Sequence, residues 1–338
     1  MGRMTFNPGE LADSLSETAG YKAGLALSIE ELCEHLSGTE YPDTIRSSEK
    51  YGASLRSEEY EILFYKLLYN IGYTAEEYDG DYTGAKYFHK YRHTALEQWA
   101  GVTNLFVEIW PKLVEATLAS GSKSVDPSPF MRAAFDKYGR LGLDMAMERL
   151  DVLEKALNLN PHSIQRYVEW HSPVQLESLF KGTKDKPEFG RFIDQRYIDY
   201  LCKNDDRIGA IHWRKFEEFT AEFFHREGYT VELGPGSNDD GVDVRIWKDG
   251  QTTTENPHCL VQCKRQRDKV ERVVVKGLFA DVSFEGADLG LVVTTSELSP
   301  GARSTISARG YPIQEIERKG LAEWLRKLRT PGTGIIRV

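Results

Sequence analysis

The spacing of apolar residues predicts that residues 1–200 are mostly helical. In the segment 57–73, apolar side chains recur every three or four positions and therefore share one face of a helix. These side chains are Tyr60, Leu63, Phe64, Leu67, Leu68 and Ile71. Two longer helices are predicted at 94–120 and 129–157, with a proline-containing break between them. Ser57 is expected to cap the first helix, because its short hydroxyl can accept a backbone N–H.

The pattern changes after residue 205. A helix is predicted at 212–229, and its expected apolar face consists of Trp213, Phe216, Phe219, Phe223 and Phe224. Short β-type runs separated by turn residues then occur at 230–233, 242–247, 259–264, 290–295 and 312–316. Further helices are predicted at 270–286, 299–310 and 320–329. This alternation predicts an αβα sandwich, in which helices cover both faces of a mixed central sheet.

The length of 338 residues suggests two domains of roughly 150 residues each. The change in pattern predicts a mainly α-helical N-terminal domain at 1–205 and an α/β domain at 206–338. No apolar run approaches the roughly 20 residues that span a bilayer, and the first residues lack the features of a signal peptide. Four cysteines are too few for a disulfide scaffold. We therefore exclude membrane-spanning and disulfide-rich classes and expect a cytoplasmic protein.

Charge is distributed unevenly along the chain. The net charge is −9, yet residues 206–338 hold 20 basic and 20 acidic residues, so the whole excess belongs to residues 1–205. Because negative charge repels nucleic acid, phosphate contacts are expected in the second domain. Its densest basic run continues from Lys264 through Arg265, Arg267, Lys269, Arg272 and Lys276. These last five residues are expected to contact DNA phosphates; a solvated loop and helix face is the alternative.

Candidate chemistry is concentrated between residues 239 and 264. Asp239, Asp240 and Asp243 come directly before a predicted strand, and Gln262 and Lys264 lie two apart on the next one. Alternation along a strand puts Gln262 and Lys264 on one face, where Asp243 joins them if the strands are neighbours. Hard oxygen ligands of this kind select Mg²⁺ or Mn²⁺, which lower the pKa of bound water. A lysine beside the metal can offset developing negative charge, so the set suits phosphodiester hydrolysis.

These motifs together resemble a known nuclease family. The matching features are Asp-x-x-x-Asp (239–243), Gln-x-Lys (262–264), the preceding Phe-Glu (216–217) and the following Val-Thr-Thr-Ser (293–296). Over about residues 210–328 the chain resembles the Mrr-type restriction endonuclease domain of the PD-(D/E)xK nuclease superfamily. The resemblance implies a restriction-endonuclease-like αβα fold and metal-dependent cleavage of DNA.

The resemblance also implies a role for each matching residue. Asp243 would be the principal metal ligand, Gln262 would occupy the second acidic position, and Lys264 would be the motif lysine. The backbone carbonyl of Cys263 would add a ligand. Glu217 on the preceding helix matches the acidic residue that often completes such sites; the alternative is that it is a solvated carboxylate, like Glu218 and Glu222 on the same helix.

Two assignments keep a structural alternative. Asp239 matches the family's other aspartate, but Asp239 and Asp240 together also have the composition of a solvated turn. For Lys264 the alternative is that it marks the point where its strand leaves the sheet for solvent.

We therefore expect a Mg²⁺- or Mn²⁺-dependent endonuclease that cleaves DNA, in a setting of bacterial restriction or antiviral defence. The helical domain is expected to control specificity, activation or assembly, with a protein or small-molecule activator as its partner. A homo-oligomer is expected because cutting both strands of a duplex needs two active sites, or one that acts twice. The alternatives are a catalytically silent nucleic-acid-binding module, a nuclease for RNA or branched DNA, and a nuclease held inactive by its N-terminal domain.

Overall fold

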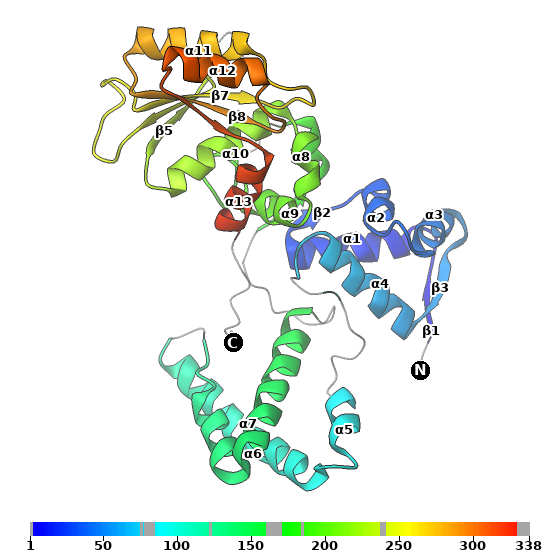
Figure 1. Ribbon diagram of the computed structural model, residues 1–338. Helices are drawn as coiled ribbons and strands as arrows, with labels where there is room; N and C mark the ends of the chain where they lie inside the picture. The colour runs from blue at the N-terminus through cyan, green and yellow to red at the C-terminus, as the bar shows by residue number, and fades with distance from the viewer. Residues whose placement is uncertain are drawn as a thin grey trace.

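The computed structural model describes residues 3–74, 77, 85–121, 124–159, 171–183, 186–236 and 241–329. Figure 1 shows a sandwich of helices and sheet, a group of helices from the start of the chain, and a separate helical body. In the part of the chain described, no helix is long and apolar enough to cross a membrane.

A five-stranded mixed sheet forms the centre of the C-terminal sandwich. Its strands are β5 (Thr230–Leu233), β6 (Val244–Trp247), β7 (Cys259–Lys264), β8 (Leu289–Thr294) and β9 (Ile313–Ile316), in that spatial order. The pairs β5–β6 and β6–β7 are antiparallel, and β7–β8 and β8–β9 are parallel. The helices are α10 (Trp213–Arg226), α11 (Arg272–Glu285), α12 (Pro300–Arg309) and α13 (Arg318–Leu328). Helices α11 and α12 cover one face of the sheet, with α10 and α13 on the other (Figure 1), as the sequence predicts.

Successive side chains of the central strands pack alternately into two apolar cores. Val261 of β7 belongs to the core that contains Phe216 and Phe219 of α10. Its neighbour Leu260 belongs to the core that contains Leu278 of α11. A strand buried on both faces is typical of the parallel part of such sheets.

The beginning of the chain forms a group of helices with two short sheets. Its helices are α1 (Glu10–Ala23), α2 (Ile29–His35), α3 (Tyr41–Tyr51) and α4 (Ser57–Asn70), and its strands are β1 (Arg3–Phe6), β2 (Leu25–Ala26), β3 (Ala53–Arg56) and β4 (Val174–Gln175). The apolar face predicted for 57–73 is buried throughout. The cap predicted at Ser57 is wrong by one residue. Ser57 is the first helical residue, and the carboxylate of Glu59 accepts the N–H of Arg56 at 2.8 Å.

Helices α8 (Glu177–Lys181) and α9 (Gln195–Lys203), followed by the 3₁₀ helix η1 (Asp205–Gly209), join this group to the sandwich. The buried carboxylate of Glu222 on α10 accepts the N–H groups of Arg191 and Phe192 at 2.8 and 2.7 Å. The amide of Gln195 donates to the carbonyl of Leu328 on α13 at 3.0 Å. One apolar core contains residues of α1–α4, α9, α10 and α13. It continues across the predicted boundary at 205/206, which remains a prediction.

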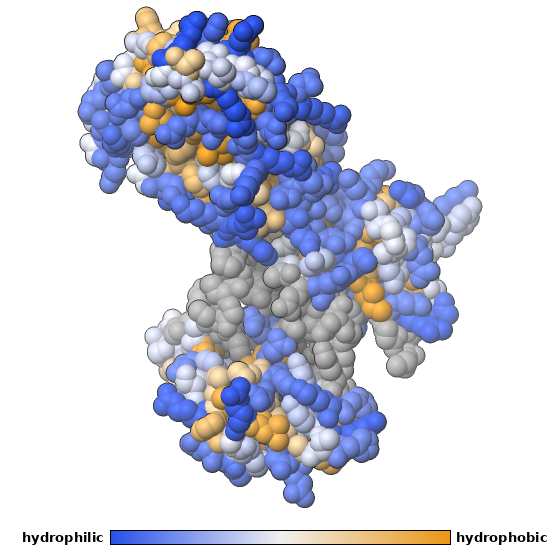
Figure 2. Space-filling view, viewed as in Figure 1, coloured by the Kyte–Doolittle hydropathy of each residue, from blue (hydrophilic) through white to orange (hydrophobic). Residues whose placement is uncertain are grey.

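The helical body consists of α5 (Ala85–Tyr91), α6 (Leu96–Ala119) and α7 (Ser128–Leu159). It has its own core, in which Phe106, Trp110 and Phe130 pack together. Several large apolar side chains of α6 and α7 remain exposed, among them Val107 and Leu118. Apolar residues are visible on the surface of this body in Figure 2.

Candidate active site

Asp243 is fixed where β6 begins beside β7. Val244 pairs with Val261, and the N–H of Asp243 extends the ladder by donating to the Val261 carbonyl at 2.9 Å. The Asp243 carboxylate accepts the N–H of Cys263 at 2.6 Å and is 8% exposed. This register places Asp243 opposite Gln262, as the sequence predicts for neighbouring strands.

Glu217 approaches the same place from α10. Its carboxylate is 6% exposed and accepts a hydrogen bond from Arg214 at 2.9 Å. Burial and the neighbouring Asp243 carboxyl group raise the pKa of Glu217, and the Arg214 guanidinium opposes this rise. Two carboxyl groups held together away from water favour a cation between them. Glu218 and Glu222 take other partners on the same helix, Lys215 and Arg226, each at 2.7 Å.

Gln262 supplies an oxygen without a protein partner. Its Oε1 atom is buried and has no hydrogen bond from any described residue. Gly241, at φ 92°, lies directly beside it, because a Cβ atom there would be 3.0 Å from Gln262 Nε2. A buried amide oxygen normally has a donor or an ion. The orphaned oxygen therefore fits a metal ligand and agrees with the adjacent pair of carboxyl groups.

Lys264 follows Gln262 on the same face of β7, two residues along. It is half-buried, and within the described residues its ammonium has no hydrogen-bond or ion-pair partner. The intervening Cys263 points its thiol to the other face, 3.6 Å from the Thr220 hydroxyl. Burial and Asp243 raise the pKa of that thiol, so it stays protonated and is a poor metal ligand.

The arrangement offers oxygen ligands alone. Within the described ranges, no group of three His, Cys, Asp or Glu side chains is arranged to hold a metal ion. A metal held here would need Asp243 and Glu217 together with the amide oxygen of Gln262 and the backbone carbonyl of Cys263, which is a hard set that suits Mg²⁺. Asp239 and Asp240 lie outside the described residues.

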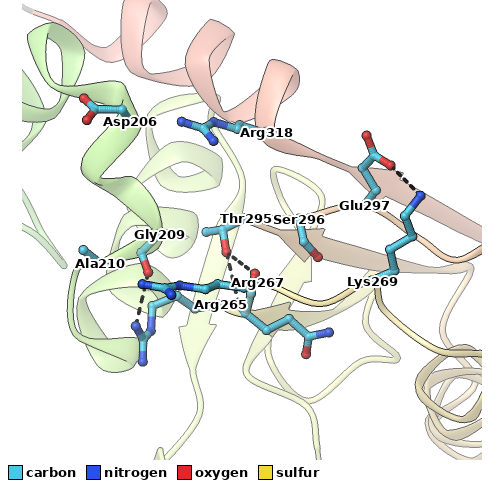
Figure 3. Close-up of a pocket in the computed structure, with 11 residues that line it drawn as sticks. Asp206, Gly209, Ala210, Arg265, Arg267, Lys269, Thr295, Ser296, Glu297 and Arg318 are labelled. Atoms are coloured by element: carbon cyan, nitrogen blue, oxygen red, sulfur yellow. Dashed lines mark hydrogen bonds and ion pairs between the residues drawn. The ribbon is translucent and has the colours of Figure 1, made fainter.

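A basic pocket of about 730 Å³ lies where β7 and β8 end, beyond Lys264. Arg265, Arg267 and Lys269 line it from the segment after β7, and Arg318 lines it from the start of α13 (Figure 3). Arg265 donates to the Gly209 carbonyl of η1 at 3.2 Å, and Lys269 pairs with Glu297 at 3.1 Å. Arg318 was not predicted, because it is distant in sequence from the basic run.

The other two predicted DNA-contacting residues, Arg272 and Lys276, are exposed on α11 and do not line this pocket. The five residues thus divide into three at the pocket and two on a helix beside the sheet. Their contact with DNA remains a prediction.

Comparison with known proteins gives three findings. Residues 208–325 match the family model Mrr_cat, described as restriction endonuclease. A protein of Sinorhizobium fredii (strain NBRC 101917 / NGR234), described as "Uncharacterized protein y4cE", is 30% identical over 95 residues, which are 28% of this chain and 24% of that protein. The structure titled "MspJI Restriction Endonuclease in Complex with 27-mer Oligonucleotide" aligns with 56% of this chain and 41% of its own, at 19% identity and a TM-score of 0.27.

These findings differ in weight. The chain spans about a quarter of the length of the S. fredii protein, and the low TM-score of the MspJI alignment supports no conclusion about shared geometry. The family match stands independently, and it covers α10, the whole sheet and the residues from Glu217 to Lys264. Residues 208–325 are therefore a restriction endonuclease domain of the Mrr type.

Proposed function

We propose that this protein is a metal-dependent endonuclease that hydrolyses phosphodiester bonds in DNA. The observation that carries the proposal is the pair of buried carboxyl groups, Asp243 and Glu217, beside the partnerless Gln262 oxygen. Lys264, also without a partner among the described residues, extends from the same face. A purely structural site would leave fewer polar groups unsatisfied.

Each side chain has a distinct task in this proposal. A bound Mg²⁺ or Mn²⁺ would polarise the phosphate and lower the pKa of a water molecule. The Cys263 N–H holds the Asp243 carboxylate in one orientation, and Arg214 does the same for Glu217. The Lys264 ammonium lies beside the position of the scissile phosphate, where it stabilises negative charge that develops as the bond breaks.

DNA is the substrate class that the basic pocket favours. Arg265, Arg267, Lys269 and Arg318 line one cavity next to the motif lysine, at the same edge of the sheet. Guanidinium groups bind phosphate oxygens in pairs, which suits a nucleic-acid backbone. We assign this pocket to the strand that continues from the scissile phosphate.

Bacterial restriction or antiviral defence is the biological setting that we propose for this activity. The N-terminal helices and the α5–α7 body would control activation or assembly. Exposed apolar surface on α6 and α7 is typical of protein contacts, and a second copy of this chain would supply the second cut of a duplex.

The test is cleavage of supercoiled plasmid by the full chain with Mg²⁺ or Mn²⁺, with and without EDTA. Asp243→Ala and Lys264→Ala are expected to lose nicking by at least about 100-fold. Matched controls are Asp249→Ala, which alters an exposed turn carboxylate, and Lys112→Ala, which alters an exposed lysine on α6.

Metal-dependent cleavage lost only in the two site variants supports the proposal. Binding of DNA without cleavage under every metal would instead indicate the silent binding module. Cleavage of RNA alone would correct the substrate class.

A further inference from the structure

Trp213 does not belong to the core as its spacing predicts. The buried aromatic residues of α10 begin with Phe216 and Phe219, whereas the Trp213 ring, in the first turn, is 42% exposed. Leaving a large indole in water forgoes the free energy of its burial. The exposed part of the Trp213 side chain is therefore accessible to a ligand.

The Trp213 ring lies beside the His212 ring and close to two glycines. His212 caps α10 by accepting the Arg214 N–H at 3.2 Å, and its ring lies 5.1 Å from that of Trp213 between centroids. A Cβ atom on Gly182, at φ 77°, would be 2.5 Å from the His212 ring. On Gly236, at φ 85°, it would be 3.2 Å from the indole. Glycine on both sides thus leaves room for this aromatic pair.

The same turn of α10 carries the candidate catalytic carboxyl group. Trp213 and Glu217 are separated by four residues and so lie on one face of the helix, with Cβ atoms about 5–6 Å apart. Between them, Arg214 bonds both Glu217, at 2.9 Å, and the Gly234 carbonyl, at 2.8 Å. Gly234 in turn donates to the Asp243 carbonyl at 2.8 Å. The turn of α10 that carries Trp213 and Glu217 is therefore hydrogen-bonded to the segment that carries Asp243.

We propose that Trp213 is a stacking platform for one nucleobase next to the scissile phosphate. Bases inside a duplex are covered on both faces by their neighbours, so only an unpaired or extruded base can offer its face to the indole. The substrate would accordingly be DNA with a base that is unpaired, or made so, beside the cut. This inference rests on the proposed nuclease function.

Equilibrium binding tests the proposal without requiring turnover. Fluorescein-labelled 20-nucleotide DNA would be titrated with the full chain carrying Asp243→Asn, as a perfect duplex and as a duplex with one unpaired base. Adding Trp213→Ala should weaken binding of the second DNA by about 5- to 100-fold, the usual effect of losing one stacked base. Trp213→Phe should retain most of it. Phe284→Ala is the matched control, because that aromatic ring is 92% exposed on α11.

A second measurement reports stacking directly. With 2-aminopurine as the unpaired base, binding of the protein that retains Trp213 should quench the 2-aminopurine fluorescence, whereas binding of the Trp213→Ala variant should not. Thermal melting of each variant confirms that it folds. Equal loss of binding to both DNAs, or unchanged quenching in Trp213→Ala, overturns the stacking role. The wild-type plasmid assay is independent of this result, so cleavage there with no Trp213 effect refutes only this inference. No binding and no cleavage would refute the nuclease function as well.

Discussion

Replacing Glu217 with glutamine is expected to stabilise the metal-free protein while it abolishes cleavage. The Glu217 and Asp243 carboxyl groups are both buried, and burial, together with repulsion from the Asp243 carboxylate, raises the pKa of Glu217. Glutamine keeps the shape and can still accept the hydrogen bond from Arg214, but it removes one of the two like charges. Relieving a poorly satisfied buried group contributes about 1–3 kcal/mol to the free energy of unfolding. For a chain of 338 residues that corresponds to a rise in Tm of roughly 1–4 °C.

The size of this stabilisation depends on pH. A carboxyl group whose pKa is raised in the folded state holds its proton there when the unfolded chain has already lost it. Its contribution to stability is therefore lost as pH rises above the ordinary value of 4.5. The rise in Tm caused by Glu217→Gln should be small at pH 5 and large at pH 8, as measured by thermal melting in EDTA.

The matched control is Glu218→Gln on the same helix. Its carboxylate pairs with Lys215 at 2.7 Å, so this change should lower the Tm or leave it unchanged. Added Mg²⁺ should raise the Tm of the wild type more than that of Glu217→Gln, because a ligand stabilises the state that binds it. A Tm for Glu217→Gln that falls at pH 8, or full cleavage by this variant, would refute the reasoning.

Three further results are expected. Burial and the nearby Arg207 lower the pKa of His35 to about 4, so as the pH falls the unfolded chain binds a proton at His35 before the folded chain does. The free energy of unfolding, measured by urea titration, should therefore fall by about 3 kcal/mol from pH 6.5 to 4. The same dependence of this free energy on pH in a His35→Gln variant would contradict the prediction. Gly241→Val should displace the Gln262 amide and reduce plasmid cleavage at least about tenfold, whereas unchanged cleavage would separate Gln262 from catalysis. Arg318→Ala should weaken DNA binding and reduce the salt slope by about 1, and an unchanged slope in fluorescence anisotropy would remove Arg318 from the interface.

Periodicity predicted the elements of the sandwich well because its strands and helices carry regular apolar patterns. The runs at 230–233 and 259–264 are strands with those same bounds. The strands at Leu25–Ala26 and Val174–Gln175 are too short to show any period, and their pairing joins parts of the chain that are distant in sequence. No local pattern could have indicated it.

The candidate site shows a similar division. Alternation brought Gln262 and Lys264 to one face, and the strand register brought Asp243 opposite them. Spacing on α10 could not rank Glu217 above Glu222, because the difference lies in their partners: Glu222 accepts two backbone N–H groups from another segment. Arg318 reaches the basic pocket through tertiary folding alone.

The core that continues across residue 205 limits how this protein can be divided. Hydrogen bonds from 191–195 to α10 and α13 mean that a fragment beginning at residue 206 would leave acceptors and apolar surface of the sandwich open to water. Higher activity in such a fragment would not by itself indicate release from inhibition, because the cut also changes the stability of the C-terminal sandwich. The helices at the start of the chain and the five-stranded sheet share one apolar core, so a substitution in either is expected to alter the melting of both.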